Sequence, residues 1–282
     1  MSATERAIRL VEGYLSLTSG LRRPPDFLII GAQRAGTTSL YRYLAQHPQV
    51  VPALGAKGAH YFDTHAERSV AWYRSHFVAE PYRWYLELRS GSRTATGEAS
   101  PYYLFHPHAP RRAADVVPGA KLIALLREPA ARALSHHTHE VTGGFEPLVR
   151  FEDAIAAEPA RVEPETARME QDETYVSFAH QHYSYLSRGH YAEQLQRWLD
   201  HYPREQLLVL SAERFFARPA TEFARVTEFL SLEPASGIEF RAYNAHDYDA
   251  MRPRTRAALH DAFAVANDKL FGLLDDDLGW ER

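Results

Sequence analysis

A short apolar run followed by a loop of small residues constrains this chain more than any other feature. Residues Phe27 to Ile30 follow two prolines and stop at Gly31, which is typical of a strand buried in a parallel sheet. The loop ends in three consecutive hydroxyl residues, Thr37 to Ser39, after which apolar residues recur at helical spacing. A strand that leads through such a loop into a helix directs free N–H groups and the positive end of the helix dipole at an anion. The segment therefore predicts a phosphate-binding loop or, without a ligand, a simple glycine-containing turn.

The loop lacks the lysine of the nucleotide-binding pattern G-x-x-x-x-G-K-[ST]. Gly36 is followed directly by Thr37, and the cation of the loop stands earlier, at Arg34. A guanidinium, a glycine and three hydroxyl groups in so short a stretch favour an anion-binding loop over a turn that binds nothing. We therefore expect a phosphate site in which an arginine replaces the usual lysine.

A second apolar run, Leu122 to Leu126, is also followed by residues that suit a phosphate. Arg127 stands at its end, and a helix is predicted from Pro129, with Ser135 on its early turns. An arginine at the carboxyl end of a strand can hold a phosphate through its fork of N–H donors. Alone, the pattern R-x-P-x-x-R-x-x-S can also arise from a helix start beside a surface arginine. Two such units in one chain imply a ligand that carries phosphates at two separate places.

The two motifs resemble those of the sulfotransferases that use 3′-phosphoadenosine 5′-phosphosulfate (PAPS). The first resembles that family's 5′-phosphosulfate loop, and the second resembles its 3′-phosphate motif. The branch with the heparan sulfate N- and 3-O-sulfotransferase domains is the most similar. The resemblance extends over nearly the whole chain, through HYFD (His60 to Asp63), VAWYRSHF (Val70 to Phe77), GEASPYYL (Gly97 to Leu104), RGHYAEQLQRWL (Arg188 to Leu199), QLLVLSAERFFARPA (Gln206 to Ala220) and LGW (Leu278 to Trp280).

The resemblance implies in-line transfer of a sulfuryl group from PAPS to a hydroxyl or amine, which releases adenosine 3′,5′-bisphosphate (PAP). It implies that Arg34 stabilises the leaving phosphate electrostatically, and it implies no metal. Arg127 and Ser135 are the implied contacts of the 3′-phosphate, and Tyr248 is the best match for an adenosine contact. The implied contacts of the 5′-phosphate are the other loop residues: Ala35, Gly36, Thr37, Thr38 and Ser39.

The general base is where the chain departs from this family. Relatives commonly read K-E-x-H-F-F and use the glutamate as base, whereas Gly58 occupies that position here. His60 is one replacement, because its ordinary pKa near 6.5 suits a base and an extended segment would put it on the same face as position 58. Glu98, at a predicted strand end, matches a family glutamate, and His139 matches a histidine of the N-sulfotransferase branch.

Each of these three residues also has a structural alternative: packing for His60, orientation of neighbours for Glu98, and a solvated helix position for His139. Loss of a general base lowers a rate typically by 10²–10⁴ without abolishing it. A catalytically impaired PAPS- or PAP-binding protein is therefore one alternative function. A variant P-loop kinase is a weaker one, because it needs a magnesium-binding acid where Arg127 stands. The histidines at 136, 137 and 139 are not expected to bind a metal, since 15 histidines in one chain cluster by chance.

Strands that alternate with helices predict an α/β fold, here a P-loop-like three-layer domain with a central parallel sheet. We expect a single domain over residues 1–282, with a helix in 1–22 and a mobile insertion at 143–172. The sequence has no cysteine, no signal-peptide pattern and no apolar run long enough to span a membrane, which suggests a cytoplasmic enzyme. Its net charge of −4 argues against general nucleic-acid binding. The acceptor is left open between a glycan, a lipid and a small molecule.

Overall fold

Four parallel strands form one sheet in the part of the chain that the computed structural model describes, residues 17–241, 243 and 251–280. Their order across the sheet is β2 (Gly97–Ala99), β1 (Phe27–Gly31), β3 (Lys121–Leu126) and β4 (Leu207–Ser211). Every residue of β1 is buried, as are all residues of β3 after Lys121. Continuous apolar runs form these two strands because both faces of the sheet are covered.

The register of the sheet brings the two phosphate motifs to the same edge. Phe27 lies opposite Gly97 in β2 and opposite Lys121 in β3, and Leu122 lies opposite Leu207 in β4. Because all neighbours are parallel, the four strands end on one side. Ligands of open α/β sheets bind at this carboxyl edge. The loop after β1 and Arg127 after β3 are therefore adjacent.

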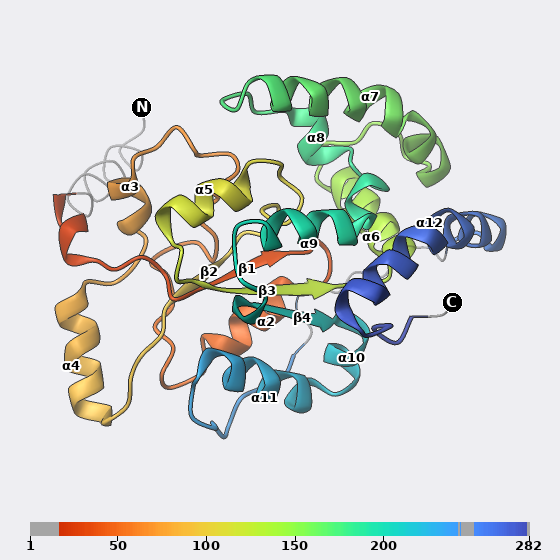
Figure 1. Cartoon of the computed structure of the whole chain (residues 1–282). Coiled ribbons are helices and arrows are strands. Elements are labelled where there is room, and N and C mark those ends of the chain that lie inside the picture. Colours follow the sequence, from red (N-terminus) through yellow and green to blue (C-terminus); the bar gives the residue numbers. More distant parts are fainter. Residues whose placement is uncertain (1–16, 242, 244–250, 281–282) are drawn as a thin grey trace.

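Helices cover both faces of the sheet and confirm the predicted three-layer α/β architecture (Figure 1). Helices α2 and α11 lie on one face, while α5 and α9 lie on the other, where α12 packs against α9. The helices and short 3-10 turns are η1 Ser19–Leu21, α2 Thr37–Leu44, α3 Val70–Arg74, α4 Glu80–Ser90, α5 Ala109–Val116, α6 Pro129–Thr142, α7 Phe151–Gln171, α8 Phe178–His182, η2 Ser187–Gly189, α9 Tyr191–Leu199, η3 Arg204–Gln206, α10 Ala212–Ala217, α11 Pro219–Leu230 and α12 Pro253–Leu274.

The segment 143–172, where the sequence predicted a mobile insertion, contains the long helix α7. Its Phe151 is buried in a small hydrophobic cluster with Tyr185. The buried carboxylate of Glu158 accepts hydrogen bonds from the backbone N–H groups of Leu186 and Ser187 at 2.6 and 2.8 Å. The segment thus has regular structure and a packed face, and its mobility stays a prediction.

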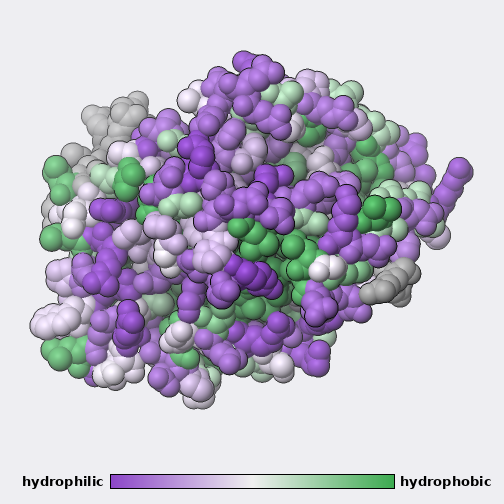
Figure 2. Space-filling view, viewed as in Figure 1, coloured by the Kyte–Doolittle hydropathy of each residue, from purple (hydrophilic) through white to green (hydrophobic). Residues whose placement is uncertain are grey.

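The helix predicted within residues 1–22 lies mostly outside the described residues, which begin with Leu17 and a 3-10 turn at Ser19–Leu21. None of the helices that the structure describes is both long and apolar enough to cross a lipid bilayer. On the face shown in Figure 2, hydrophobic residues gather over the β4 edge of the sheet beside α12, and hydrophilic residues cover much of the remainder.

Candidate active site

A cavity of about 990 Å³ opens at the carboxyl edge of the sheet, and residues that follow all four strands line it. Those after β2 and those after β4 lie on opposite sides, because these are the edge strands, while the loop after β1 and Arg127 lie between them. The described lining residues are Gln33, Arg34, Gly36, Thr37, Thr38, Tyr43, Lys57, His60, Pro101, Tyr102, Arg127, Ala131, Ser135, His139, Glu140, Phe145, Gln181, His182, Ala212, Glu213, Phe216, Pro219, Phe240 and Tyr243.

The loop after β1 has the form of an anion site. Gly36 precedes the first turn of α2 with φ +103°, and no side chain caps the helix there. The N–H groups of the first turn have no intrahelical acceptor, so they suit a ligand at the cavity floor beside Thr37 and Thr38. A Cβ at position 36 would come within 2.6 Å of the Phe216 ring. The backbone conformation therefore favours glycine, and any side chain at this position would also have to displace the Phe216 ring.

Three residues predicted to hold two different phosphates form one connected group. Arg34 donates a hydrogen bond from Nε to Ser135 Oγ at 3.2 Å, and Arg127 donates to the carbonyl oxygen of Arg34 at 3.3 Å. Tyr191 in turn donates from its hydroxyl to the Arg127 carbonyl oxygen at 2.8 Å. Arg34, Arg127 and Ser135 all line the cavity.

Two other predicted loop contacts point away from the cavity. Ala35 is buried, and its N–H is bonded within the loop to the carbonyl oxygen of Ala32. Ser39 is fully buried on the inner face of α2, where its Oγ accepts a hydrogen bond from the Tyr243 N–H at 3.0 Å. Neither belongs to the cavity lining. Tyr248 lies outside the described residues.

Aromatic rings line the β4 side of the cavity, and the sequence analysis did not single them out. Tyr43 of α2 contacts the Phe240 ring edge to face, with centroids 5.0 Å apart. Tyr243 lies under the guanidinium of Arg42 at 4.2 Å, and Phe216 contributes a third wall from α10. Flat apolar walls next to a phosphate site suit a nucleobase. One of these rings could have been found from the sequence, because Phe216 lies in the segment after a predicted strand, where ligands of such sheets bind.

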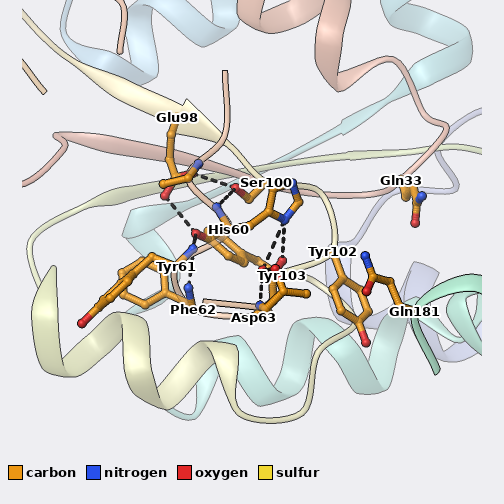
Figure 3. A network of polar contacts seen from close by, with 12 residues as sticks. Gln33, His60, Tyr61, Phe62, Asp63, Glu98, Ser100, Tyr102, Tyr103 and Gln181 are labelled. Carbon is orange, nitrogen blue, oxygen red and sulfur yellow. Dashed lines mark hydrogen bonds and ion pairs between the residues drawn. The ribbon is translucent and has the colours of Figure 1, made fainter. Parts of the chain in front are cut away.

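His60 is the predicted base whose surroundings suit that role best. Its ring lines the cavity, and its Nδ1 lies 2.9 Å from a buried carboxylate oxygen of Asp63 (Figure 3). Burial alone would lower the pKa of His60, but the hydrogen bond to Asp63 and the charges of Asp63 and Glu98 outweigh it and raise that pKa above 6.5. Because Asp63 accepts from Nδ1–H, the lone pair of the neutral ring is at Nε2.

Glu98 lies beneath this site and not in the cavity lining. It is fully buried, and both carboxylate oxygens accept hydrogen bonds. Oε1 accepts from the hydroxyls of Tyr73 and Tyr103 at 2.8 and 3.0 Å, and Oε2 accepts from Ala59 N–H and Ser100 Oγ at 2.7 Å each. Figure 3 shows the contacts of Glu98 with Tyr103 and Ser100. A carboxylate held in this way orients its neighbours and has no path to an acceptor.

Gly58, which replaces the family glutamate, has no room for a side chain. A Cβ there would collide with the Ala99 carbonyl oxygen and come within 2.7 Å of Ser100 Oγ. The neighbouring residue explains the close approach, because the Lys57 carbonyl oxygen accepts a hydrogen bond from Ala99 N–H at 2.8 Å. The chain around Gly58 thus lies directly against the end of β2.

Lys57 is a further lining residue to which the sequence analysis gave no role. Burial and the nearby charge of Arg42 lower its pKa to about 8, against the opposing effect of Glu98. Among the described lining residues, Arg34, Lys57 and Arg127 are the arginines and lysines. Arg34 lies in the loop after β1, Arg127 follows β3, and Lys57 lies three residues before His60.

His139 is an exposed lining residue on α6, one turn beyond Ser135. Next to it, Glu140 is buried and lies 2.7 Å from His182 Nδ1 and 3.2 Å from His136 Nε2. Although burial opposes ionisation, the contacts with His136 and His182 lower the pKa of Glu140 to about 2. Glu140 and His182 also line the cavity, and the sequence analysis did not pair them. In the described residues, no group of three or more metal-ligating side chains is placed to hold an ion.

A buried arginine supports the cavity wall near His60. Arg188 donates to Gln33 Oε1 and, at 2.7 Å, to the Gln181 carbonyl oxygen, while its guanidinium lies 4.7 Å from the Tyr102 ring centroid. Gln33, Tyr102 and Gln181 lie on the side of His60 away from Tyr61 in Figure 3. One cation thereby fixes wall residues from three separate segments.

Comparison with known proteins identifies the class. Residues 24–256 match the family model described as sulfotransferase domain. The human heparan sulfate glucosamine 3-O-sulfotransferase 3A1 is 32% identical over 219 residues, covering 78% of this chain and 47% of that protein. The membrane-associated sulfotransferase kil1 of Dictyostelium discoideum is 25% identical over 322 residues, covering 92% and 67%. A crystal structure of a sulfotransferase from Alicyclobacillus acidocaldarius matches with a TM-score of 0.64 at 30% identity, covering 90% of this chain and 97% of that one.

The chain therefore belongs to the sulfotransferase family, whose donor is PAPS. The predicted resemblance and the P-loop-like α/β fold are confirmed. The chain spans about half the length of the human heparan sulfate relatives that it matches.

Proposed function

We propose that this chain transfers a sulfuryl group from PAPS to an acceptor hydroxyl or amine, and that His60 accepts the acceptor's proton. The observation that carries the proposal is the His60–Asp63 pair on the wall of the cavity into which the phosphate loop opens. A base beside an anion-binding loop is the arrangement that nucleophilic attack on a phosphosulfate requires.

The residues of the cavity fit the two phosphates of the donor. The N–H groups at the start of α2, with the hydroxyls of Thr37 and Thr38, would hold the 5′-phosphate, and Arg127 with Ser135 would hold the 3′-phosphate. The uncapped start of α2 and the glycine with positive φ that precedes it support this assignment. The rings on the β4 side, Phe240 and Tyr243, would accommodate the adenine.

Fixed cations at the loop would stabilise the charge that develops on the leaving phosphate. Arg34 stays charged at any pH and lies in the lining. Lys57, with a pKa of about 8, is charged at neutral pH and is the second cation next to the reacting centre. The chemistry needs no proton from either residue, because a phosphate leaves as an anion.

The carboxylate of Asp63 prepares His60 for its role in two ways. It accepts from Nδ1–H, which leaves Nε2 as the proton acceptor, and it stabilises the imidazolium that forms. Glu98 supports the same segment from beneath, because it binds Ala59 N–H and Ser100, whose Oγ in turn accepts from His60 N–H at 3.0 Å. We therefore assign catalysis to His60 and positioning to Asp63 and Glu98.

Turnover of radiolabelled PAPS with an acceptor library tests this assignment. His60→Ala should lower kcat by about 10²–10⁴ and leave the Kd for PAP unchanged, because it removes a base and no phosphate contact. His139→Ala is the matched control and should change kcat by less than about 3-fold, since the proposal gives it no part in proton transfer. Loss of activity in His139→Ala with a fully active His60→Ala would contradict the assignment.

The two alternative functions predict different results. An impaired binding protein, which Gly58 suggests, would bind PAP tightly and turn over with no acceptor. A variant kinase would prefer ATP with magnesium to PAPS, although Arg127 follows β3 where such an enzyme needs an acid. Calorimetry with PAP and with magnesium–ATP therefore separates the kinase from the other two functions, and the turnover assay with the acceptor library separates those two from each other.

A further inference from the structure

The cavity continues past the phosphate site along one stripe of α6. Ala131, Ser135 and His139 are spaced four residues apart and all line the cavity, so it follows this helix from its start toward its end. Arg127 precedes the helix, whereas Phe145 follows it, and Phe145 N–H is bonded to the Glu140 carbonyl oxygen at 2.9 Å. The two ends of the stripe therefore differ in chemistry: cations at one, rings at the other.

Three rings form a cluster at the far end, which we call the ring platform: Phe145, Phe178 and His182. His182 stacks on Phe145 with centroids 4.5 Å apart and lies 4.2 Å from the Phe178 ring. Phe145 and Phe178 remain 45% and 49% exposed although they are large apolar residues. Phe145 and His182 line the cavity, with Tyr102 and Gln181 nearby in the same lining.

The charges around the ring platform disfavour an anionic ligand. Glu140 lies in the lining beneath His182, and its pKa of about 2 keeps it ionised. The lining arginines and lysines of the described chain belong to the phosphate side. Arg161, whose guanidinium lies 4.1 Å from the ring centroid of Tyr183, directs both terminal nitrogens at the carboxylate of Glu146, at 3.1 and 3.0 Å. A polyanion at this end would meet no arginine or lysine of the described lining, and the buried carboxylate of Glu140 offsets charge on His182.

We propose that the ring platform is the acceptor subsite and that it takes a small, uncharged, ring-bearing hydroxyl compound rather than an anionic glycan. This inference rests on the proposed sulfuryl transfer. The cavity, about 990 Å³, is at the upper end of the roughly 300–1,000 Å³ range of small-molecule sites, which suits a nucleotide and a compact acceptor together. An acceptor stacked on Phe145 would share its cavity with His60, whose side chain also lines it.

The test compares three probes at saturating donor: 2-naphthol, 6-hydroxy-2-naphthoate, which adds one carboxylate to the same ring system, and N-sulfated heparosan as a polyanion. We expect kcat/KM for 2-naphthol to exceed that of the naphthoate by about 10-fold or more and that of the polyanion by a larger factor. Phe145→Ala should raise the KM for 2-naphthol about 10-fold and leave the Kd for PAP unchanged. Tyr82→Ala removes an equally exposed ring on α4, far from the cavity lining, and should change neither value.

Binding measurements separate failure of the inference from failure of the proposed function. Calorimetry first measures PAP binding, and then 2-naphthol binding to the PAP complex. Absence of PAP binding would overturn the proposed function and the inference with it. Normal PAP binding with preference for the polyanion, or with 2-naphthol binding that is absent or unaffected by Phe145→Ala, would overturn the inference alone.

Discussion

Arg34 and Ser135 are joined by a hydrogen bond of 3.2 Å, although they belong to motifs 101 residues apart in the sequence. The sequence assigned Arg34 to the reactive end of the donor and Ser135 to its ribose phosphate. In the proposed donor site, their contact joins the residues for the two ends of the donor into one connected group, which includes Arg127 through the Arg34 carbonyl oxygen. A change at either residue is expected to affect both donor recognition and turnover.

Ser135→Ala tests this connection. We expect it to reduce the preference for PAP over adenosine 5′-phosphate by about 10-fold, the loss of roughly one charge-assisted hydrogen bond, and to lower kcat as well. Thr138→Ala, on the same helix but outside the cavity lining, should leave both unchanged. Calorimetry with both nucleotides gives the preference. An unchanged ratio of the two Kd values would remove the basis for the 3′-phosphate site.

The pH dependence of kcat/KM should have two limits. His60 must be neutral to accept a proton, and its pKa is raised, so activity should fall as the pH drops through a value above 6.5. Lys57 must be charged, so activity should fall again as the pH rises through about 8. Asp63→Asn removes the charge that raises the His60 pKa and should move the acid limit to lower pH while lowering the maximum rate. An acid limit that stays in place in this variant would exclude His60 as the titrating group.

Glu98→Gln should destabilise the fold more than it alters donor binding. One oxygen that accepts two hydrogen bonds becomes an NH₂ group, so two buried donors lose their acceptor: either the Tyr73 and Tyr103 hydroxyls at Oε1 or Ala59 N–H and the Ser100 hydroxyl at Oε2. We expect a cost of about 3 kcal/mol. Glu87→Gln is the control, because Glu87 also accepts two hydrogen bonds, from Thr94, but is only partly buried, and it should cost less than about 1 kcal/mol. Urea unfolding measures both. Equal losses in the two variants would show that Glu98 is not a structural anchor.

Gly36→Ala should weaken PAP binding through two separable effects. The φ of +103° strains any other residue, and the new Cβ would approach Phe216 within 2.6 Å. Gly91 also has a positive φ, +71°, but nothing lies within 4 Å of its Cβ position, so Gly91→Ala reports strain alone. We expect about 1–2 kcal/mol of lost stability in Gly91→Ala and a greater loss, with weaker PAP binding, in Gly36→Ala. Partial recovery of stability in Gly36→Ala/Phe216→Ala would identify the ring contact.

The fold, and the position of both motifs at the carboxyl ends of β1 and β3, could be predicted because they depend on local patterns. Apolar runs that stop at Gly31 and at Arg127 encode buried parallel strands and the residues at their carboxyl ends. The hydroxyl run was less informative, because a helix turns by about 100° per residue and the sequence does not say which hydroxyl faces the cavity. Thr37 and Thr38 line it, whereas Ser39 is buried and binds Tyr243 N–H.

The sequence could name three candidates for the general base but could not rank them, because distant parts of the chain form much of their environments. The oxygens of Glu98 are occupied by hydrogen bonds from the hydroxyl of Tyr73, 25 residues away, and from Ala59 N–H, 39 residues away, so Glu98 is a poor candidate for the base. The pairing of His60 with Asp63 could have been predicted from the sequence, since the two residues are only three positions apart. The pairing of Glu140 with His182 depends on how α8 packs and left no local signal.

The absence of space at Gly58 has a consequence for how such an enzyme can change. A glutamate cannot be regained there by one substitution, since the backbone at 57–58 would first have to withdraw from Ala99 and release the hydrogen bond between them. Carboxylate-based and imidazole-based versions of this site are therefore separated by a shift of the main chain.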